Sequence, residues 1–220
     1  MILEVRAVAP FYKNGFLVAC SRTKEAIVID PGDEIDEILG AVRDHDVQVQ
    51  HILLTHAHLD HVSGVDTAKA ALDAPVYLHR DDLPLYEHVV EQGAMFGFKV
   101  RSQPPVDVFY DMTPIYFGDY AVRVHHTPGH CPGGVCLQVG KKDEDGKHLF
   151  VGDTLFAAGI GRTDLPGGNY DVLMSSITGV LFALGDDAVV HPGHGADTTI
   201  GRERATNPFV VEYLTGQQRS

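Results

Sequence analysis

The stretch Thr55-His56-Ala57-His58-Leu59-Asp60-His61 follows directly on 51–54, an apolar run with the length of a buried strand. His56 and His58 are two residues apart, so both imidazoles lie on one face of an extended backbone, and we expect Asp60 to continue that face. His61 is expected to point elsewhere, at the turn into the next helix. Three imidazoles and one carboxylate within six residues have the ligand density of a transition-metal site, whereas a chance polar turn leaves these groups without partners.

Three later segments repeat this arrangement, in which an apolar strand is followed by a polar side chain in a loop with glycine or proline. Segment 124–130 ends at His130, segment 149–154 contains Asp153, and segment 189–195 contains His194. Loops that a rigid sheet positions are where binding and catalytic residues concentrate. With the first stretch they supply seven candidate ligands, enough for two metal ions: His56, His58, Asp60, His61, His130, Asp153 and His194.

The spacing of apolar residues predicts two sheets, each covered by helices. In the first half we expect antiparallel strands over 16–20 and 26–29, a helix from Ile35 through Val42, a strand over 51–54, a loop over 55–61, a helix over 63–72, a strand over 76–78 and a helix over 81–94. In the second half we expect strands over 106–110, 115–117, 121–125, 135–139 and 149–152 in a mostly antiparallel sheet, a helix over 173–184 and a buried strand over 188–190. This order favours an α/β (α+β) fold, a four-layer αββα sandwich.

Composition bounds the remaining possibilities. The 220 residues carry 17 Lys and Arg against 30 Asp and Glu, a net charge of 17 − 30 = −13, which disfavours a nucleic-acid surface because such surfaces are basic. With 44% hydrophobic residues the chain can bury a full core, and we expect a single domain over 1–220. Three cysteines do not indicate a disulfide framework, and neither a signal peptide nor a membrane-spanning run is recognised, so we expect a cytoplasmic protein.

The order of the seven candidate ligands, beginning with His56-x-His58-x-Asp60-His61, resembles that of the metallo-β-lactamase superfamily. The resemblance covers almost the whole chain and implies an αββα fold with the site at one edge of the sandwich. It further implies that Asp153 bridges two metal ions. The other ligands are implied to divide into one set for each ion: His56, His58 and His130 for the first, and Asp60, His61 and His194 for the second.

Within the superfamily the sequence is most similar to the glyoxalase II-like branch, in particular to short bacterial hydroxyacylglutathione hydrolases. The resemblance is carried by 153–156, by Gly161-Arg162-Thr163-Asp164 and by Asn207-Pro208-Phe209. Arg162 lies where glyoxalase II has a lysine that contacts the glutathione part of its substrate, which implies a substrate-binding role for Arg162. Asp164 replaces that family's tyrosine, and the chain is expected to lack the C-terminal helical domain of glyoxalase II.

These residues imply a dinuclear metal-dependent hydrolase that cleaves a thioester, S-D-lactoylglutathione or a related hydroxyacyl thioester. Two divalent ions about 3.5–4 Å apart lower the pKa of a shared water toward about 7, so that metal-bound hydroxide attacks the carbonyl. Asp60 is expected to be catalytic, orienting the hydroxide and accepting its proton. A thiolate, whose conjugate thiol has a pKa of about 8.5, leaves without a strong general acid. Zinc is the expected metal, with iron or manganese as alternatives, because imidazole and carboxylate ligands suit all three.

Two alternatives to the hydrolase stay open. The 161–164 stretch also resembles that of mononuclear iron persulfide dioxygenases, which act on glutathione persulfide, although retention of all seven ligands favours the hydrolase. A structural metal module is disfavoured, because structural zinc sites are closed four-ligand cages. The expected partner is a small-molecule thioester, a glutathione conjugate, and not nucleic acid or a membrane, and the chain is expected to be a monomer or a homo-oligomer.

Weaker patterns assign a few other residues. His126 and His191 are close in sequence to candidate ligands and are candidates to orient them. Cys136 lies in an apolar strand and is expected to fill the core. We expect 81–105 and the C-terminal tail to line the entrance of the pocket.

Overall fold

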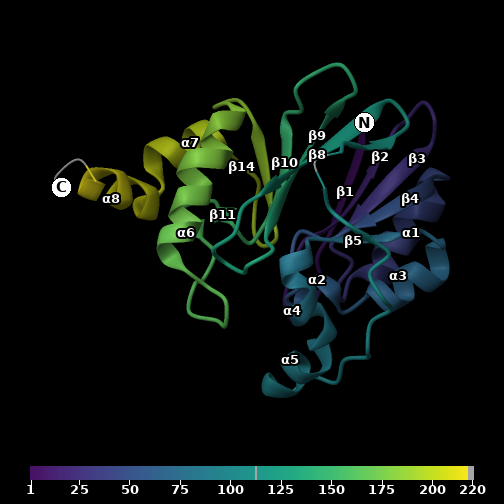
Figure 1. The fold of residues 1–220 in the computed structure, drawn as a ribbon. Coiled ribbons are helices and arrows are strands. Elements are labelled where there is room, and N and C mark those ends of the chain that lie inside the picture. The colour runs from purple at the N-terminus through teal and green to yellow at the C-terminus, as the bar shows by residue number, and fades with distance from the viewer. Residues whose placement is uncertain (112, 218–220) are drawn as a thin grey trace.

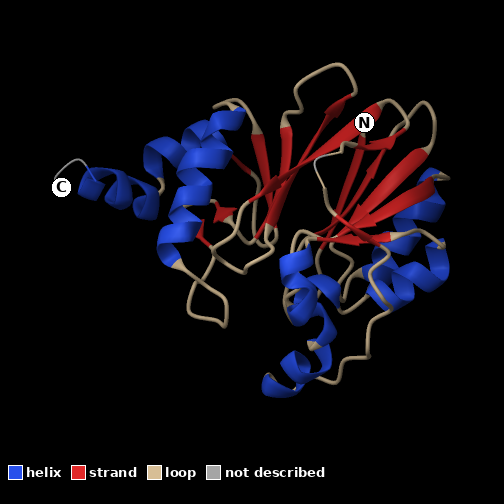
Figure 2. Ribbon diagram, viewed as in Figure 1, coloured by secondary structure: helices blue, strands red, loops and turns tan. Residues whose placement is uncertain are grey.

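The computed structural model, which describes residues 1–111 and 113–217, has two six-stranded sheets packed face to face, with helices on the outer face of each (Figures 1 and 2). The first sheet has the strand order β1-β2-β3-β4-β5-β6, and the second has the order β14-β13-β10-β9-β8-β7. The predicted αββα sandwich is therefore confirmed.

The first sheet combines antiparallel and parallel pairs. β1, β2 and β3 pair antiparallel, as predicted for 16–20 and 26–29, whereas β3, β4, β5 and β6 are mutually parallel. Its strands are Ile2–Arg6 (β1), Gly15–Ala19 (β2), Glu25–Ile29 (β3), Gln48–Leu53 (β4), Val76–Leu78 (β5) and Val108–Phe109 (β6).

The second sheet is antiparallel from β7 to β10 and contains one parallel pair, β10 with β13. Its strands are Ile115–Phe117 (β7), Tyr120–His126 (β8), Val135–Lys141 (β9), His148–Gly152 (β10), Val189–Pro192 (β13) and Thr198–Thr199 (β14). A separate small hairpin joins Leu155–Phe156 (β11) to Gly159–Ile160 (β12).

The helices lie in two groups, one beside each sheet, and the last helix of the first group lies below the strand ends in this view (Figure 2). The first group comprises Ile35–His45 (α1), Leu59–Val62 (α2), Val65–Leu72 (α3), the 3₁₀ turn Arg80–Asp82, Leu83–Glu87 (α4) and Val89–Met95 (α5). The second comprises Tyr170–Ser175 (α6), which continues as a π turn over Ser176–Val180 and a 3₁₀ turn over Leu181–Leu184, followed by Ile200–Thr206 (α7) and Pro208–Gln217 (α8). No helix in 1–111 or 113–217 is both long and apolar enough to cross a membrane.

The alternation of side chains along β2 shows why the layers form. Leu17 and Ala19 belong to the apolar cluster between the first sheet and its helices, whereas Phe16 and Val18 belong to the cluster between the two sheets. Successive side chains of a strand point to opposite faces, so a strand in the middle layers is buried on both. This explains why 16–20 is a continuous apolar run and not an alternating one.

The predicted loop over 55–61 and the predicted helix over 81–94 have other boundaries in the structure. The predicted loop over 55–61 ends early, because α2 begins at Leu59 with His58 at its N-terminal boundary. The predicted helix over 81–94 is broken at His88, and the Gln92 side chain donates to the Leu85 carbonyl (2.6 Å) across the break. Pro84 does lie in the first turn of α4, as expected.

The strand predicted over 106–110 was placed in the wrong sheet. β6 is shorter than predicted and pairs in parallel with β5 of the first sheet, through Tyr77 with Val108 and Leu78 with Phe109. The Asp107 carboxylate also accepts the backbone N–H of Val76 (2.8 Å). These partners lie about 30 residues upstream, so periodicity along the chain could not identify them.

Candidate metal centre

Loops that follow five strands meet at one edge of the sandwich. Asp30 follows β3 and His56 follows β4, two parallel neighbours of the first sheet. In the second sheet Asp153 follows β10 and His194 follows β13, which are also parallel neighbours, and His130 follows β8. The carboxyl ends of parallel strands share an edge, so these segments, far apart in sequence, bring their polar side chains together.

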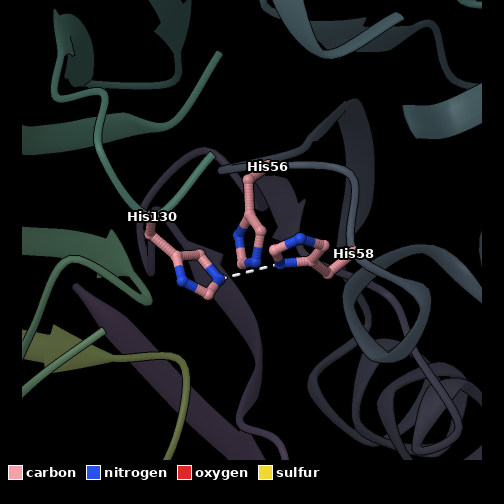
Figure 3. A group of neighbouring side chains, drawn as sticks. All are labelled: His56, His58 and His130. Atoms are coloured by element: carbon pink, nitrogen blue, oxygen red, sulfur yellow. Dashed lines mark hydrogen bonds between the residues drawn. The ribbon is translucent and has the colours of Figure 1, made fainter. Parts of the chain in front are cut away.

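The first donor cluster consists of His56, His58 and His130, whose rings point toward one another (Figure 3). Each offers a ring nitrogen, and these atoms lie within 4.8 Å of one another. His58 Nδ1 and His130 Nε2 are hydrogen-bonded at 2.8 Å. The extended backbone up to His58 places His56 and His58 on the same side, as their spacing predicts.

The second donor cluster consists of Asp60, His61 and His194, again with donor atoms within 4.8 Å of one another. His194 Nε2 lies 3.0 Å from Asp60 Oδ2, and His61 Nε2 lies 3.7 Å from the same oxygen. The expectation that Asp60 continues the face of His56 and His58 is wrong. Because α2 begins at Leu59, the helical turn directs Asp60 toward His194.

Asp153 lies between the two clusters. Its Oδ1 is 3.3 Å from His61 Nε2, and its Oδ2 is 3.7 Å from His130 Nε2 and 3.6 Å from His194 Nε2. The approach of the His194 loop requires glycine at position 193, where a Cβ atom would lie 2.2 Å from Asp153 Oδ1. The carboxylate can therefore reach both clusters, which is the placement that a bridging ligand needs.

Within the described ranges, two donor atoms of the clusters, His56 Nε2 and His61 Nε2, are buried without a hydrogen-bond partner, and so is Asp153 Oδ1. Unpaired buried polar atoms are costly, and a bound cation removes that cost. The donor set contains only imidazole nitrogens and carboxylate oxygens, which suit zinc, iron and manganese. The residues present therefore fit a metal centre.

The opposite ring nitrogens of three histidines are held by fixed partners. His61 Nδ1 donates to Asp30 Oδ2 (2.9 Å), and His130 Nδ1 donates to the Arg162 carbonyl (2.7 Å). His56 Nδ1 lies 3.1 Å from the Thr55 hydroxyl, which itself donates to Asp30. In a neutral imidazole, a proton held on Nδ1 by such a bond leaves Nε2 free to bind a metal ion.

The charges of the two clusters differ. Burial, followed by the neighbouring His130, lowers the pKa of His58 to about 3, and burial also lowers the pKa of His56 well below its usual value, so His56 and His58 are neutral imidazoles. Burial also lowers the pKa of His61, but the carboxylates of Asp60 and Asp153 outweigh it and raise that pKa to about 10. Burial raises the pKa of Asp60, and the cation of His61 outweighs that effect and lowers it. A metal ion in the second cluster must therefore displace the His61 proton.

Two supporting carboxylates were not identified from the sequence. Asp30, interpreted only as part of a turn, is fully buried and accepts from the Thr55 backbone (2.6 Å) as well as from His61. Asp82, also fully buried, accepts from the backbone N–H groups of Ala57 (2.9 Å) and Gly133 (2.5 Å). Asp82 thereby ties the His56–His58 loop to the loop that follows His130. The sequence signal that could have identified Asp30 is its position directly after the predicted strand over 26–29, where a polar side chain follows an apolar run as in the other segments.

The N-terminal segment holds the His194 loop. The Asn14 amide donates to the carbonyls of Pro192 (3.0 Å) and Gly195 (2.9 Å), and the Asn14 backbone N–H donates to Gly193 (2.7 Å). These bonds enclose His194 on both sides. Nothing in the sequence around Asn14 indicates this role, because its partners lie about 180 residues away.

The orienting role expected for His126 and His191 is wrong. His126 stacks on His79 with ring centroids 4.1 Å apart, and His191 stacks on His148 and Phe150. Among the described residues, neither is hydrogen-bonded to a predicted ligand. Cys136 is fully buried in the apolar cluster beside α6, as expected, and the three cysteines are free.

A cavity of about 300 Å³ opens above the two clusters. The expectation that 81–105 lines it is confirmed by Leu85, Gln92, Met95 and Phe96, but none of the described residues of the C-terminal helix α8 does so. In Figure 1, α8 lies at the far side of the second sheet. Arg162 lines the cavity, with its guanidinium paired to Asp164.

The pattern of the metallo-beta-lactamase superfamily matches residues 8–194, and the chain belongs to this superfamily. One relative is the hydroxyacylglutathione hydrolase GloC of Haemophilus influenzae, 34% identical over 96% of this chain and 98% of that protein. The solved structure of BLEG-1 B3 metallo-beta-lactamase is 32% identical with a TM-score of 0.86, over 95% of this chain and 99% of that one. TTHA1623 in a di-iron-bound form is 39% identical with a TM-score of 0.82, over 94% of this chain and 99% of that one.

Proposed function

We propose that this protein is a dinuclear metal-dependent hydrolase that cleaves thioesters, with S-D-lactoylglutathione or a related hydroxyacyl thioester as the first substrates to test. The observation that carries the proposal is the pair of donor clusters on either side of Asp153. The similarity to GloC supports a hydroxyacyl thioester as the substrate class.

In this proposal each residue has a defined task. His56, His58 and His130 would hold one divalent ion, Asp60, His61 and His194 would hold the other, and Asp153 would serve both. The ions supply a Lewis acid for the carbonyl oxygen and a water of lowered pKa. The task of this chain is to keep the imidazoles in the correct tautomer, through Asp30, Thr55 and the Arg162 carbonyl.

Asp60 is the proposed catalytic residue. Its Oδ2 accepts from His194 (3.0 Å) while the side chain also lines the cavity, so the carboxylate can orient a water and accept a proton. Apart from the predicted ligands and Arg162, the described residues that line the cavity are not titratable. Apart from Asp60, no general acid is therefore placed to protonate an amine leaving group, which favours a thiolate, whose thiol has a pKa of about 8.5.

Zinc is the proposed metal, and iron and manganese are the alternatives. The ligand types do not separate the three. The di-iron form of TTHA1623 supports two-ion occupancy at a centre of this kind and keeps iron among the candidates.

The experiment is an assay of the purified protein, loaded in turn with zinc, iron and manganese, on S-D-lactoylglutathione and on glutathione persulfide. Release of free thiol from the thioester, without oxygen uptake on the persulfide, is the expected result. Oxygen uptake with the iron-loaded protein and no thioester cleavage would establish the mononuclear persulfide dioxygenase instead.

A further inference from the structure

The cavity above the donor clusters has a polar floor and apolar walls. The floor is formed by predicted ligands, among them His58, Asp60 and Asp153. The walls come from the N-terminal segment, α4, the end of α5 and the loop after Arg162, and they are formed by these side chains: Phe11, Leu85, Met95, Phe96, Leu165 and Pro166. Floor and walls therefore offer different chemistry to a bound molecule.

Two wall side chains are strongly exposed to solvent. Met95, the last residue of α5, is 76% exposed, and Phe96 is 55% exposed. Large apolar side chains gathered at the rim of a cavity that contains convergent polar groups are typical of a ligand-binding surface. A ligand that covers them gains affinity in proportion to the apolar area removed from water.

The polar wall residue Gln92 has no free donor for a ligand. Its Nε2 donates to the carbonyls of Leu85 (2.6 Å) and Ala57 (3.2 Å), and its Oε1 accepts from the Leu59 backbone (3.1 Å). Both amide hydrogens are thus donated within the chain. A carboxylate in the cavity finds no hydrogen-bond donor on Gln92.

Arg162 is the one lysine or arginine that lines this cavity in the part of the chain the structure describes. Its Nε and Nη2 donate to Oδ1 and Oδ2 of Asp164, each at 2.7 Å. This bidentate pair is the arrangement that a substrate carboxylate would otherwise use. Glutathione carries two carboxylates, whereas the cavity offers one guanidinium, and Asp164 already occupies its bidentate face.

We propose that the walls bind an apolar group attached to the thioester, on its acyl or its thiol side, and not the charged peptide of glutathione. This substrate class rests on the thioester hydrolase function proposed above. The thioester carbonyl lies over the donor clusters, and the apolar group covers Met95 and Phe96. Selection among thioesters then follows from apolar contact, because the Gln92 amide and the bidentate face of Arg162 are already paired within the chain.

The test is a matched series of thioesters assayed on the metal-loaded full chain. One arm compares hexanoyl and acetyl thioesters of N-acetylcysteamine, and the other compares acetyl thioesters of benzyl mercaptan and N-acetylcysteamine. S-D-lactoylglutathione is the charged reference. We expect kcat/KM to rise about tenfold or more along at least one arm, since even small apolar additions give differences of that size in a fitted pocket. The arm that rises identifies the side of the thioester that contacts the walls.

A variant of one wall residue and a matched control distinguish the loss of contact with the wall from the effect of removing any exposed phenylalanine. Phe96→Ala is expected to remove most of the gain along the rising arm, measured as the ratio of kcat/KM between the two thioesters of that arm. Phe209→Ala is the control, because Phe209 is also an exposed phenylalanine (44%) but lies on α8, outside the cavity lining. It is expected to retain the gain.

Asp164→Asn tests the paired cation directly. It releases the Arg162 guanidinium, so KM for S-D-lactoylglutathione is expected to fall while KM for the acetyl thioester of N-acetylcysteamine stays the same. An unchanged KM for S-D-lactoylglutathione would contradict the inference that pairing to Asp164 withholds this cation from substrate.

The outcomes distinguish this inference from the function on which it rests. A flat series, or S-D-lactoylglutathione preferred over every apolar thioester, overturns the apolar walls and leaves thioester hydrolysis in place. A gain that persists in Phe96→Ala overturns the assignment of that wall. Failure to cleave any thioester overturns the proposed function and this inference together.

Discussion

The floor and the walls of the cavity are held in place by opposite means. His130 in the floor is buried and braced by the Arg162 carbonyl (2.7 Å), and the neighbouring predicted ligand His61 is buried and braced by Asp30 (2.9 Å). The wall residues Met95 and Phe96 are exposed and belong to a short helix and the loop after it. In our proposal the sheet edge therefore positions the catalytic groups, whereas segments outside the sheets select the substrate. Changes to the floor should abolish or weaken catalysis, and changes to the walls should alter preference alone.

Removal of the metal ions should have the largest effect. A chelator is expected to reduce thioester hydrolysis to the background rate and to lower the thermal midpoint. An ion present at about 100 times its Kd stabilises the folded state by about 2.7 kcal/mol, which corresponds to roughly 5–10 °C in a chain of this length. Activity and melting temperature should both return when zinc is added back. Full activity in the chelated protein would contradict a metal centre in the floor.

Asp153→Asn should have the second-largest effect on activity. An amide cannot serve both clusters as a charged bridge, and we expect kcat/KM to fall by about 10³-fold or more, the scale of losing several kcal/mol of Lewis-acid stabilisation. Metal content by elemental analysis should fall in parallel. Asp187→Asn, an exposed carboxylate paired with Lys147 on the surface, is the matched control and should leave both unchanged. Retained two-ion occupancy in the Asp153 variant would refute its bridging position.

Asp60→Asn should reduce turnover by about 10²-fold or more, the usual contribution of a general base. Because the amide oxygen can still act as a ligand, the variant should keep more of its metal than Asp153→Asn does. The measurement is kcat together with metal content on one preparation. Wild-type kcat in this variant would show that Asp60 is not the proton acceptor.

Asp82→Asn should lower the affinity for metal ions although it changes none of the predicted ligands. Asparagine presents an NH₂ group to one of the backbone N–H donors of Ala57 and Gly133, so the two loops lose their common tie. Metal affinity should fall by about 10- to 100-fold, as expected for a residue that orients ligands. Asp107→Asn removes a carboxylate that also accepts a backbone N–H, from Val76 outside the centre, and should leave metal affinity unchanged. Equal losses of metal affinity in Asp82→Asn and Asp107→Asn would show that Asp82 stabilises the fold in general and does not specifically position the ligands.

The wall change Met95→Ala should have the smallest effect on chemistry. Hydrolysis of a small acetyl thioester is expected to stay close to the wild-type rate, because Met95 is 76% exposed and is not one of the predicted ligands. Only the preference for bulky apolar thioesters should decline. A large loss of activity on the acetyl thioester would show that the walls and the floor are not separable.

The donors could be predicted from the sequence because each follows a buried strand, and strand ends meet at one edge. His130, Asp153 and His194 are each found this way, although 64 residues separate the first from the last. The hydrogen bonds that hold the ligand loops in place could not be predicted. Asp82 accepts from a backbone N–H of a distant loop, and Asn14 donates to a backbone carbonyl of another. The direction of Asp60 depended on where α2 begins, and helix boundaries are poorly specified by local sequence.

The most direct test of the two-ion floor is a crystal structure of the metal-loaded protein with anomalous-scattering maps. We predict two peaks about 3.5–4 Å apart on either side of the Asp153 carboxylate, one near His56, His58 and His130 and the other near Asp60, His61 and His194. A single fully occupied peak, with the second cluster still paired through its own hydrogen bonds, would contradict the dinuclear centre.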